Sequence, residues 1–167
     1  ATWGNAWADP FDGGYQQTHA MIAAASGGML GVGAGGGNLV SVFAADTDLV
    51  FGVLCEEWGL IIALLSVFSV AALALFTARS AKNSRSSFYT IAACGAMCIL
   101  VVQTMLNTLG CMDILPLTGV TFPFVSNGGS SMIASWGLLA FVKACDTRLN
   151  SSWALKGSTE DEEVDEL

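Results

Sequence analysis

The sequence predicts an all-α polytopic membrane protein, and three observations support this fold class. First, 53% of the 167 residues are hydrophobic and only 12% are charged, whereas soluble domains carry about 25% charged residues. Second, uncharged runs occur that reach the ~20 residues with which a helix crosses a bilayer core. Third, all the basic residues lie beside or after these runs, as the positive-inside rule expects of cytoplasmic segments.

Three membrane segments follow from these runs. The first is predicted over residues 49–78 and contains "LIIALLSVFSVAALALFTA". A basic loop over 79–87 separates it from the second segment, over 88–112. Prolines and a Gly-Gly pair interrupt the next apolar run, so its helix is predicted only over 126–145, after the loop 113–125.

The basic residues also set the orientation. Arg79, Lys82 and Arg85 place the loop 79–87 in the cytoplasm, and no Lys or Arg precedes Arg79. Residues 1–48 and the loop 113–125 are therefore expected outside the cytoplasm. Since irregular backbone cannot face lipid, the Gly-rich part of residues 1–48 is expected to form re-entrant or interfacial helices packed on protein.

The last segment, 146–167, is predicted to be a cytoplasmic tail. Six acids lie in its last eight residues, and such runs are typically disordered. The chain begins with Ala rather than Met, so we expect it to be a fragment of a longer protein.

Signals for other functions are weak. Gly31, Gly33 and Gly36 match the dinucleotide-binding spacing G-x-G-x-x-G, but the strand and helix that this motif requires are not predicted around them. Close backbone packing is the favoured interpretation. No basic patch indicates a nucleic-acid partner. The five cysteines lack metal-site or disulfide spacing and are interpreted as packing residues, and His19 as a surface or hydrogen-bonded residue.

Four carboxylates lead into the first membrane segment. Asp46 and Asp48 suit the start of a helix, where the helix dipole favours negative charge. Glu56 and Glu57 lie further in, between apolar runs, where charge is costly and usually functional. We expect at least one of these two glutamates to have a functional or bundle-organising role.

Polar residues also precede the third segment and interrupt the second. In the second, Gln103 and Asn107 share one helical face and are expected to bond neighbouring helices. Before the third, two interpretations stay open: a cup of backbone N–H groups for anionic oxygens, or ordinary capping of a helix. The residues concerned are Ser126, Asn127, Gly128, Gly129, Ser130 and Ser131.

The stretch "WGNAWADPFDGGYQ" combines turn residues with a large aromatic surface. Asp9 before proline, and Asp12 before two glycines, are typical of turns, in which Asp usually caps backbone groups. Trp and Tyr rings also lie at membrane interfaces and stack on sugar rings. Because Trp7 and Tyr15 flank Asp9, we favour a carboxylate that acts on a lipid-carried sugar.

At these motifs the chain resembles the SEDS family, which includes FtsW, RodA and SpoVE. "WADPFDGGYQ" is similar to the family's external loop motif, "ADTDLVFGVLCEEWG" to its next conserved block and "NTLGCMDILPLTGVTFPFVSNGGSSMI" to its C-terminal signature. The resemblance covers residues 3 to about 148 and implies a fold of about ten membrane helices. This chain would be the last external loop region and the three C-terminal helices.

The resemblance implies a peptidoglycan glycosyltransferase of cell division, elongation or sporulation. Such an enzyme polymerises lipid II in the cell membrane, with inversion and with undecaprenyl pyrophosphate as leaving group, and works with a class B penicillin-binding protein transpeptidase. The family's essential acid corresponds to Asp9, the expected general base. The expected substrate-binding residues are Trp7, Tyr15, Gln16, Asp48, Glu56, Glu57, Ser126, Gly128, Gly129, Ser130 and Ser131.

The departing pyrophosphate needs positive charge, yet no Lys or Arg lies in the predicted external segments. Either other parts of the protein supply it, or a divalent cation such as Mg²⁺ or Mn²⁺ bound by external acids does so. No metal ligands are assigned, and the isolated chain is expected to be inactive.

The chain departs from the family pattern at three places. Phe43-Ala44 replaces a Pro-Glu, Asp46 replaces a His and Asn127 replaces a Tyr, which puts substrate contacts there in doubt. Two alternative functions remain. A lipid II flippase would use Glu56 and Glu57 and would not need Asp9, and a non-enzymatic scaffold would only dock the transpeptidase.

Overall fold

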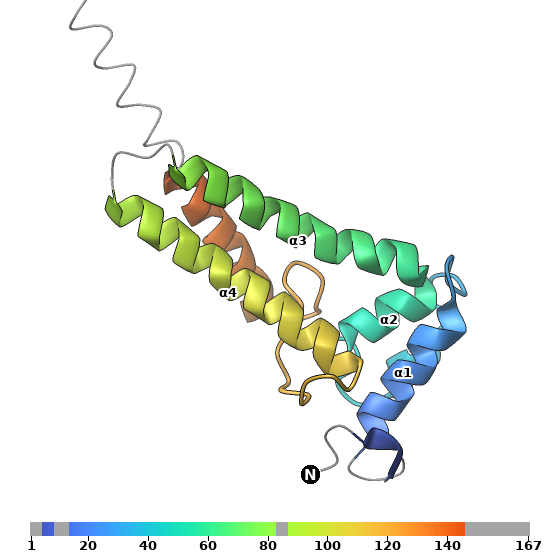
Figure 1. Cartoon of the computed structure of the whole chain (residues 1–167). Helices are drawn as coiled ribbons and strands as arrows, with labels where there is room; N and C mark the ends of the chain where they lie inside the picture. The colour runs from blue at the N-terminus through green and yellow to red at the C-terminus, as the bar shows by residue number, and fades with distance from the viewer. Residues whose placement is uncertain (1–4, 9–13, 83–86, 146–167) are drawn as a thin grey trace, which may run out of the picture.

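The computed structural model describes residues 5–8, 14–82 and 87–145, and this part of the chain is helical wherever it is regular (Figure 1). The all-α fold class is therefore confirmed. Asp9, Asp12 and the acidic tail 146–167 lie outside the described residues. The elements are η1 (Ala6–Ala8), α1 (Tyr15–Gly27), η2 (Leu39–Ser41), α2 (Val50–Glu57), α3 (Gly59–Lys82), α4 (Ser87–Cys111) and the helix Gly129–Cys145.

Two helices are long and apolar enough to cross a membrane, over Gly59–Arg79 in α3 and Ser87–Cys111 in α4. They lie side by side, and the shorter apolar helix Gly129–Cys145 packs with them (Figure 1). Where the three helices meet they form a small apolar cluster, which includes Val70, Met97, Leu100, Leu138 and Val142.

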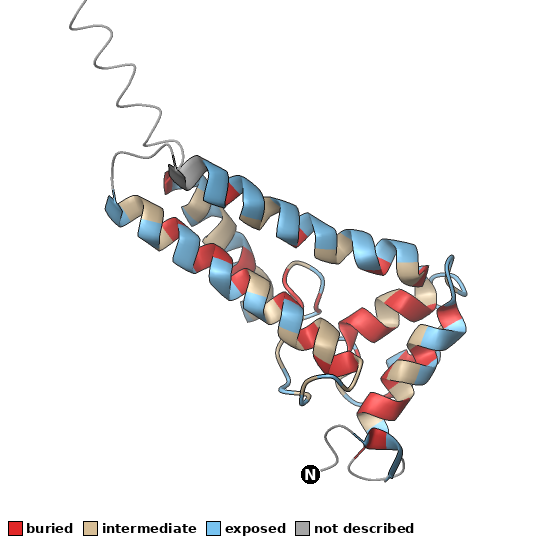
Figure 2. Ribbon diagram, viewed as in Figure 1, coloured by how far each residue is buried: buried red, intermediate tan, exposed pale blue. Residues whose placement is uncertain are grey.

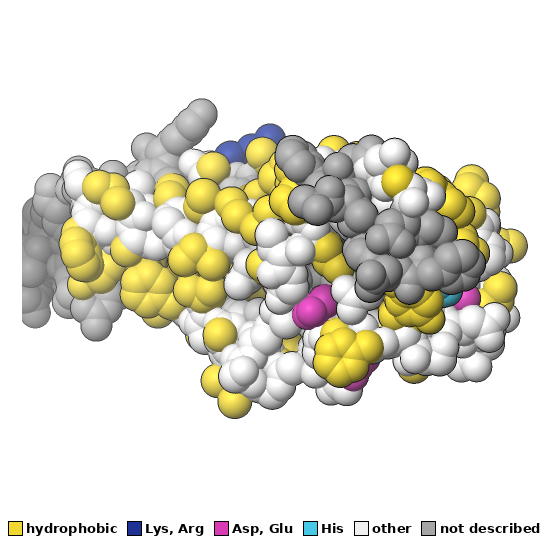
Figure 3. Space-filling view, turned by 90° about the horizontal axis from the view of Figure 1, so that it is seen from below, with side chains coloured by type: hydrophobic (Ala, Val, Ile, Leu, Met, Phe, Trp, Pro, Cys, Tyr) yellow, Lys and Arg dark blue, Asp and Glu magenta, His cyan; other side chains and the backbone are white. Residues whose placement is uncertain are grey.

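Much of the surface of α3 and α4 outside this cluster is apolar and yet exposed (Figure 2). Only 17% of the apolar window of α3 and 28% of that of α4 are buried. A helix that is apolar all round is stable when lipid or other protein covers it. In Figure 3, hydrophobic side chains are spread along this part, while the acidic side chains seen on that face lie in the half that holds α1, α2 and the loops.

The structure divides the membrane segment that the sequence predicted over residues 49–78. Helix α2 ends at Glu57, and α3 begins two residues later. Gly59 has a backbone φ of 85°, which residues with a side chain rarely adopt. A Cβ at this position would also collide with the carbonyl oxygen of Met29. The apolar run hid this break, because one glycine inside it gives no clear boundary signal.

Helices α1 and α2 pack against each other at the end of the molecule where α3 begins (Figure 1). Small residues of α1, Ala20 and Ala23, lie in the same buried cluster as Phe51 and Cys55 of α2. Cys55 is fully buried in this cluster and serves packing. The depth of α1 in the bilayer stays a prediction.

The structure tests two interpretations of this region. Asp46 and Asp48 precede Leu49, the N-cap of α2, as expected of acids near the start of a helix, although no side chain makes a capping hydrogen bond there. The glycine motif over 31–36 lies between α1 and η2, and in the described part of the chain no strand precedes it. The glycines are therefore not in the strand–turn–helix setting of a nucleotide site.

Candidate functional site

The chain on either side of the predicted catalytic turn is held by Ala6. Its backbone N–H donates to Oδ2 of Asp113 at 3.1 Å, and its carbonyl oxygen accepts from the hydroxyl of Thr18 at 3.3 Å. Ala6 is fully buried, and a Cβ on Gly14 would collide with its carbonyl oxygen. The segments before and after residues 9–13 are therefore fixed together. Asp9 lies outside the described residues, and its role stays a prediction.

The aromatic residues beside this turn are accessible. Trp7 and Tyr15 are both exposed, and the Tyr15 ring lies 4.0 Å, centroid to centroid, from the ring of His19. Gln16 donates from Nε2 to the carbonyl oxygen of Phe43 at 3.1 Å, which links the start of α1 to the loop before α2. Exposed Trp and Tyr rings can stack on another ring, and their contact with a sugar stays a prediction.

Glu56 organises the glycine-rich loop. Its side chain is only 5% exposed, and its two carboxylate oxygens accept from the backbone N–H groups of Asn38 and Leu39, both at 2.9 Å. A charged acceptor on two backbone donors is a strong arrangement. This geometry favours the bundle-organising role over substrate binding for Glu56. The neighbouring Glu57 is half-buried, and its substrate contact stays a prediction.

Asn107 and Ser126 join three segments, which are α4, the loop before α2 and the loop before the last helix. They lie next to the α1–α2 unit, by which we mean the two packed helices α1 and α2. Asn107 donates from Nδ2 to the carbonyl oxygens of Asp48 at 2.9 Å and Val120 at 2.8 Å. It therefore bonds loops rather than the neighbouring helices that the sequence suggested. Ser126 is buried; it donates to the carbonyl oxygen of Thr47 at 2.8 Å and accepts from the backbone N–H of Phe122 at 2.7 Å.

Two of the departures from the family pattern, Asp46 and Asn127, contact each other near Ser126. The backbone N–H of Asn127 donates to the carbonyl oxygen of Asp46 at 2.9 Å, and its side-chain amide donates to Oδ2 of Asp46 at 3.2 Å. The side chain of Asp48 is half-buried, with Oδ2 beside Gly119 of the loop before the third helix.

An open cavity of about 330 Å³, lined by both polar and apolar groups, lies between α4 and the helix Gly129–Cys145. The Thr121 and Ser131 hydroxyls lie 2.6 Å apart at its wall. The lining carries hydroxyl and amide groups but no charged side chain, so it suits neutral polar groups such as sugar hydroxyls or amides. The lining residues are Gln103, Thr121, Ser130, Ser131, Ala134, Ser135 and Leu138.

Gly128 and Gly129 lie at the start of this last helix, where the backbone N–H of Met132 donates to the carbonyl oxygen of Gly128 at 2.8 Å. The sequence left two interpretations of residues 126–131 open, ordinary capping of the helix and a cup for anionic oxygens. Capping explains the observed hydrogen bond without any ligand. The uncharged lining beside it favours a neutral ligand for Ser130 and Ser131.

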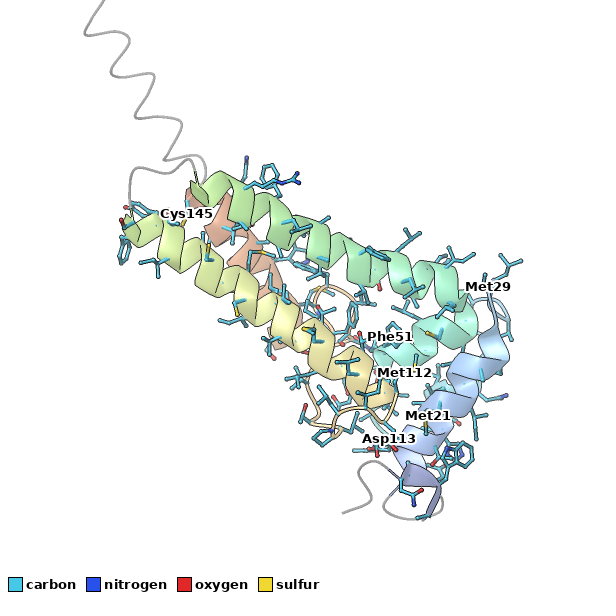
Figure 4. All side chains as sticks on the ribbon, in the orientation of Figure 1. Met21, Met29, Phe51, Met112, Asp113 and Cys145 are labelled. Atoms are coloured by element: carbon cyan, nitrogen blue, oxygen red, sulfur yellow. The ribbon has the colours of Figure 1, made fainter. Side chains whose placement is uncertain are left out.

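Sequence reasoning missed Asp113, Thr18 and Thr121. Asp113 contacts a residue 107 positions away, and no local pattern predicts such a pairing. Its one unusual feature is a φ of 57°, which Asp tolerates better than most residues. Figure 4 shows Asp113 beside the start of α1.

The described residues do not offer a metal site. Within residues 5–8, 14–82 and 87–145, no group of three or more His, Cys, Asp or Glu side chains could hold a metal ion. The described residues therefore do not by themselves fit the divalent cation considered from the sequence.

Two helices of bilayer length and a shorter apolar helix beside them are typical of a membrane protein. The FtsW/RodA/SpoVE family model, described as "Cell cycle protein", matches residues 1–151. The chain therefore belongs to this family, and the resemblance seen in the sequence is confirmed. Family membership also makes the fold a polytopic one of the cell membrane.

Relatives with curated names are similar over most of the chain. "Peptidoglycan glycosyltransferase RodA" of Mycobacterium leprae is 37% identical over 81% of this chain and 30% of the relative. "Probable peptidoglycan glycosyltransferase FtsW" of Buchnera aphidicola is 36% identical over 90% of this chain and 39% of the relative. The protein of that name in Hahella chejuensis is 35% identical over 93% and 40%. The chain thus spans 30% to 40% of these relatives.

Proposed function

We propose that the protein is a peptidoglycan glycosyltransferase that polymerises lipid II at the cell membrane. The observation that carries this proposal is the similarity to relatives of that name, at 36% to 37% identity over 81% to 90% of the chain. In this proposal the chain forms the last external loop region and the three C-terminal helices of a fold of about ten. The end with α1 and α2 faces outwards, and a class B penicillin-binding protein is the partner.

Asp9 is the general base of the proposed reaction. The acceptor sugar hydroxyl gives its proton to the Asp9 carboxylate while its oxygen attacks the anomeric carbon of the donor. The bond to the pyrophosphate breaks, and its electron pair leaves with the phosphate oxygen, so a single displacement inverts the anomeric centre. A carboxylate with an ordinary pKa of ~4 is a weak base, so the reaction needs a partly desolvated carboxylate.

The described residues support substrate binding in two places. Trp7 and Tyr15 are exposed beside the segments that flank Asp9, where they can stack on a sugar ring. Ser130 and Ser131 lie in the uncharged cavity with Gln103. Hydroxyl and amide groups there can position the neutral parts of lipid II, which are its sugars and peptide amides.

The pyrophosphate of the leaving group requires positive charge from elsewhere. Arg79 and Lys143, the basic side chains that the structure describes, are near the far ends of their helices from α1 and α2. Other parts of the protein or a divalent cation must neutralise the leaving group. We therefore expect the isolated chain to be inactive even when it inserts and folds.

The flippase alternative is less well supported. It needs Glu56 and Glu57 to line a pathway, but both oxygens of Glu56 are bound to backbone N–H groups of Asn38 and Leu39. Transport of lipid II across vesicles by the full-length protein, measured beside its polymerisation in detergent, separates the two functions.

The decisive experiment is polymerisation of lipid II by the full-length protein carrying Asp9→Asn. The amide cannot accept the proton, so polymer should fall below detection while expression and membrane insertion are unchanged. Asp12→Asn is the matched control three residues away in the same predicted turn, and we expect it to retain activity. Wild-type polymer yield from Asp9→Asn would refute the assignment, and growth supported by that variant would favour the non-enzymatic scaffold.

A further inference from the structure

Three large apolar side chains are exposed on the loop that follows α1. Met29, Leu30 and Val32 have 64%, 83% and 50% of their surface accessible. Single exposed apolar residues are normal, but a contiguous set of them marks an interaction surface. The sequence has no charged residue between Asp12 and Asp46, so no charge on this loop would oppose an apolar partner.

The exposure is built into the fold, because the backbone of this loop is anchored. The N–H of Leu60 donates to the carbonyl oxygen of Gly28 at 3.0 Å. The N–H groups of Val32 and Gly33 donate to the carbonyl oxygens of Glu56 and Glu57 at 2.9 and 3.0 Å. The loop is therefore held against the end of α2 and the start of α3 while its side chains point away.

The same hydrogen bonds make the loop compatible with lipid. Irregular backbone is excluded from the hydrocarbon region when its N–H groups lack partners. Besides the bonds of Val32 and Gly33, the N–H of Gly31 donates to the carbonyl oxygen of Gly27 at 2.8 Å. The N–H groups of Gly31, Val32 and Gly33 are thus satisfied within the protein, which lowers the cost of placing this part of the backbone near lipid.

The position of the loop identifies that partner. Met29 lies beside the first turn of α3 (Figure 4), the helix that is long and apolar enough to span a bilayer. Trp58 lies between α2 and α3, and half of its surface is exposed. Trp is enriched where a helix leaves the membrane. Ile61 and Ile62 of α3 are exposed next to it, so the apolar surface continues from the helix.

We propose that Met29, Leu30 and Val32 form an apolar anchor that inserts among lipid chains at the membrane boundary, at the Gly59 end of α3. Transfer of such side chains from water into the bilayer is favourable. The anchor would fix the height of the α1–α2 unit relative to the membrane surface, because the same loop is bonded to Glu56 and Glu57. This role does not depend on the proposed glycosyl transfer.

The test is photo-crosslinking of the full-length protein in phosphatidylglycerol and phosphatidylethanolamine vesicles. A benzophenone amino acid replaces Leu30 in one variant and Ala34, an exposed small residue of the same loop, in the matched control. After irradiation, mass spectrometry of the peptide identifies what was captured. We expect phospholipid adducts at position 30 in several-fold excess over position 34.

Two outcomes would overturn the proposal. Adducts at position 30 with another segment of the protein or with a second protein would show that polypeptide covers the loop. Equal lipid yields at both positions, or none at either, would show that the three apolar side chains do not select lipid. Activity of each variant is measured in parallel, so a failure of glycosyl transfer is distinguished from a failure of the anchor.

Discussion

The α1–α2 unit with its loops and the pair of long helices are held together by different interactions. In the long helices the hydroxyls bond their own helix: Ser66 donates to the carbonyl oxygen of Ala63, and Thr104 to that of Leu100. Around the α1–α2 unit, side chains bond segments that are 59, 79, 81 and 107 residues away. The first region depends on local bonding and an apolar exterior, the second on long-range polar contacts.

This difference explains where a site can form. A spanning helix satisfies its backbone internally and needs only apolar surface, so its sequence is loosely constrained. The loop region instead buries carboxylate, amide and hydroxyl groups at defined distances, which fixes the positions of nearby side chains. Positioned polar groups are what catalysis and selective binding require.

The largest expected effect is on Glu56, in the polar region. Glu56→Ala leaves the backbone N–H groups of Asn38 and Leu39 without their acceptor, which should lower the free energy of unfolding by about 3 to 5 kcal/mol. Thermal unfolding of the full-length protein in detergent measures the loss. Glu56→Gln keeps one acceptor oxygen, so its free energy of unfolding should lie between those of the wild type and Glu56→Ala. Equal stability of all three proteins would contradict the organising role.

A pair of leucines tests the apolar region. Leu100 is fully buried between the long helices, whereas Leu65 is mostly exposed on α3. Leu100→Ala should cost about 3 kcal/mol through lost packing and a cavity. Leu65→Ala should change stability in lipid vesicles by less than about 1 kcal/mol, since surface substitutions away from packed contacts have small effects. Equal losses would mean that another part of the protein covers Leu65.

The long helices could be predicted from the sequence, whereas much of the polar loop region could not. The second membrane segment was predicted over 88–112, and α4 occupies Ser87–Cys111. Membrane helices are specified by composition over a short window, so a single sequence contains the signal. The break at Gly59 was missed, because it depends on the close approach of Met29 from another segment.

The site was predictable in part. Local motifs pointed to Glu56, Ser130 and Ser131, but the partners of these residues could not be derived. Glu56 bonds backbone N–H groups 17 and 18 residues away, and backbone donors leave no trace in the sequence. The contact between Asp113 and Ala6 spans 107 residues, a pairing that only the folded chain brings about.

Asp113 offers a test that connects a long-range contact to the proposed function. Asp113→Ala removes the acceptor of the buried Ala6 N–H and places Ala at a φ of 57°, which should cost about 1 to 3 kcal/mol of stability. Because Ala6 fixes the segment leading to Asp9, we expect kcat for polymerisation to fall about tenfold with KM little changed. Asp113→Asn keeps an acceptor oxygen and should restore most of kcat. A loss of kcat no larger than the loss of folded protein would leave Asp113 a structural residue only.

The smallest expected effect concerns the open cavity. Ser131→Ala removes a hydroxyl that lies 2.6 Å from that of Thr121 and lines the cavity. If the cavity binds neutral groups of the substrate, KM for lipid II should rise about three- to tenfold with kcat retained, which corresponds to one lost hydrogen bond. Ser66→Ala is the matched control, because its hydroxyl bonds the carbonyl oxygen of Ala63 within α3. Equal kinetics for the two variants would exclude the cavity from substrate binding and leave the exposed aromatic surface near Asp9 as the remaining candidate.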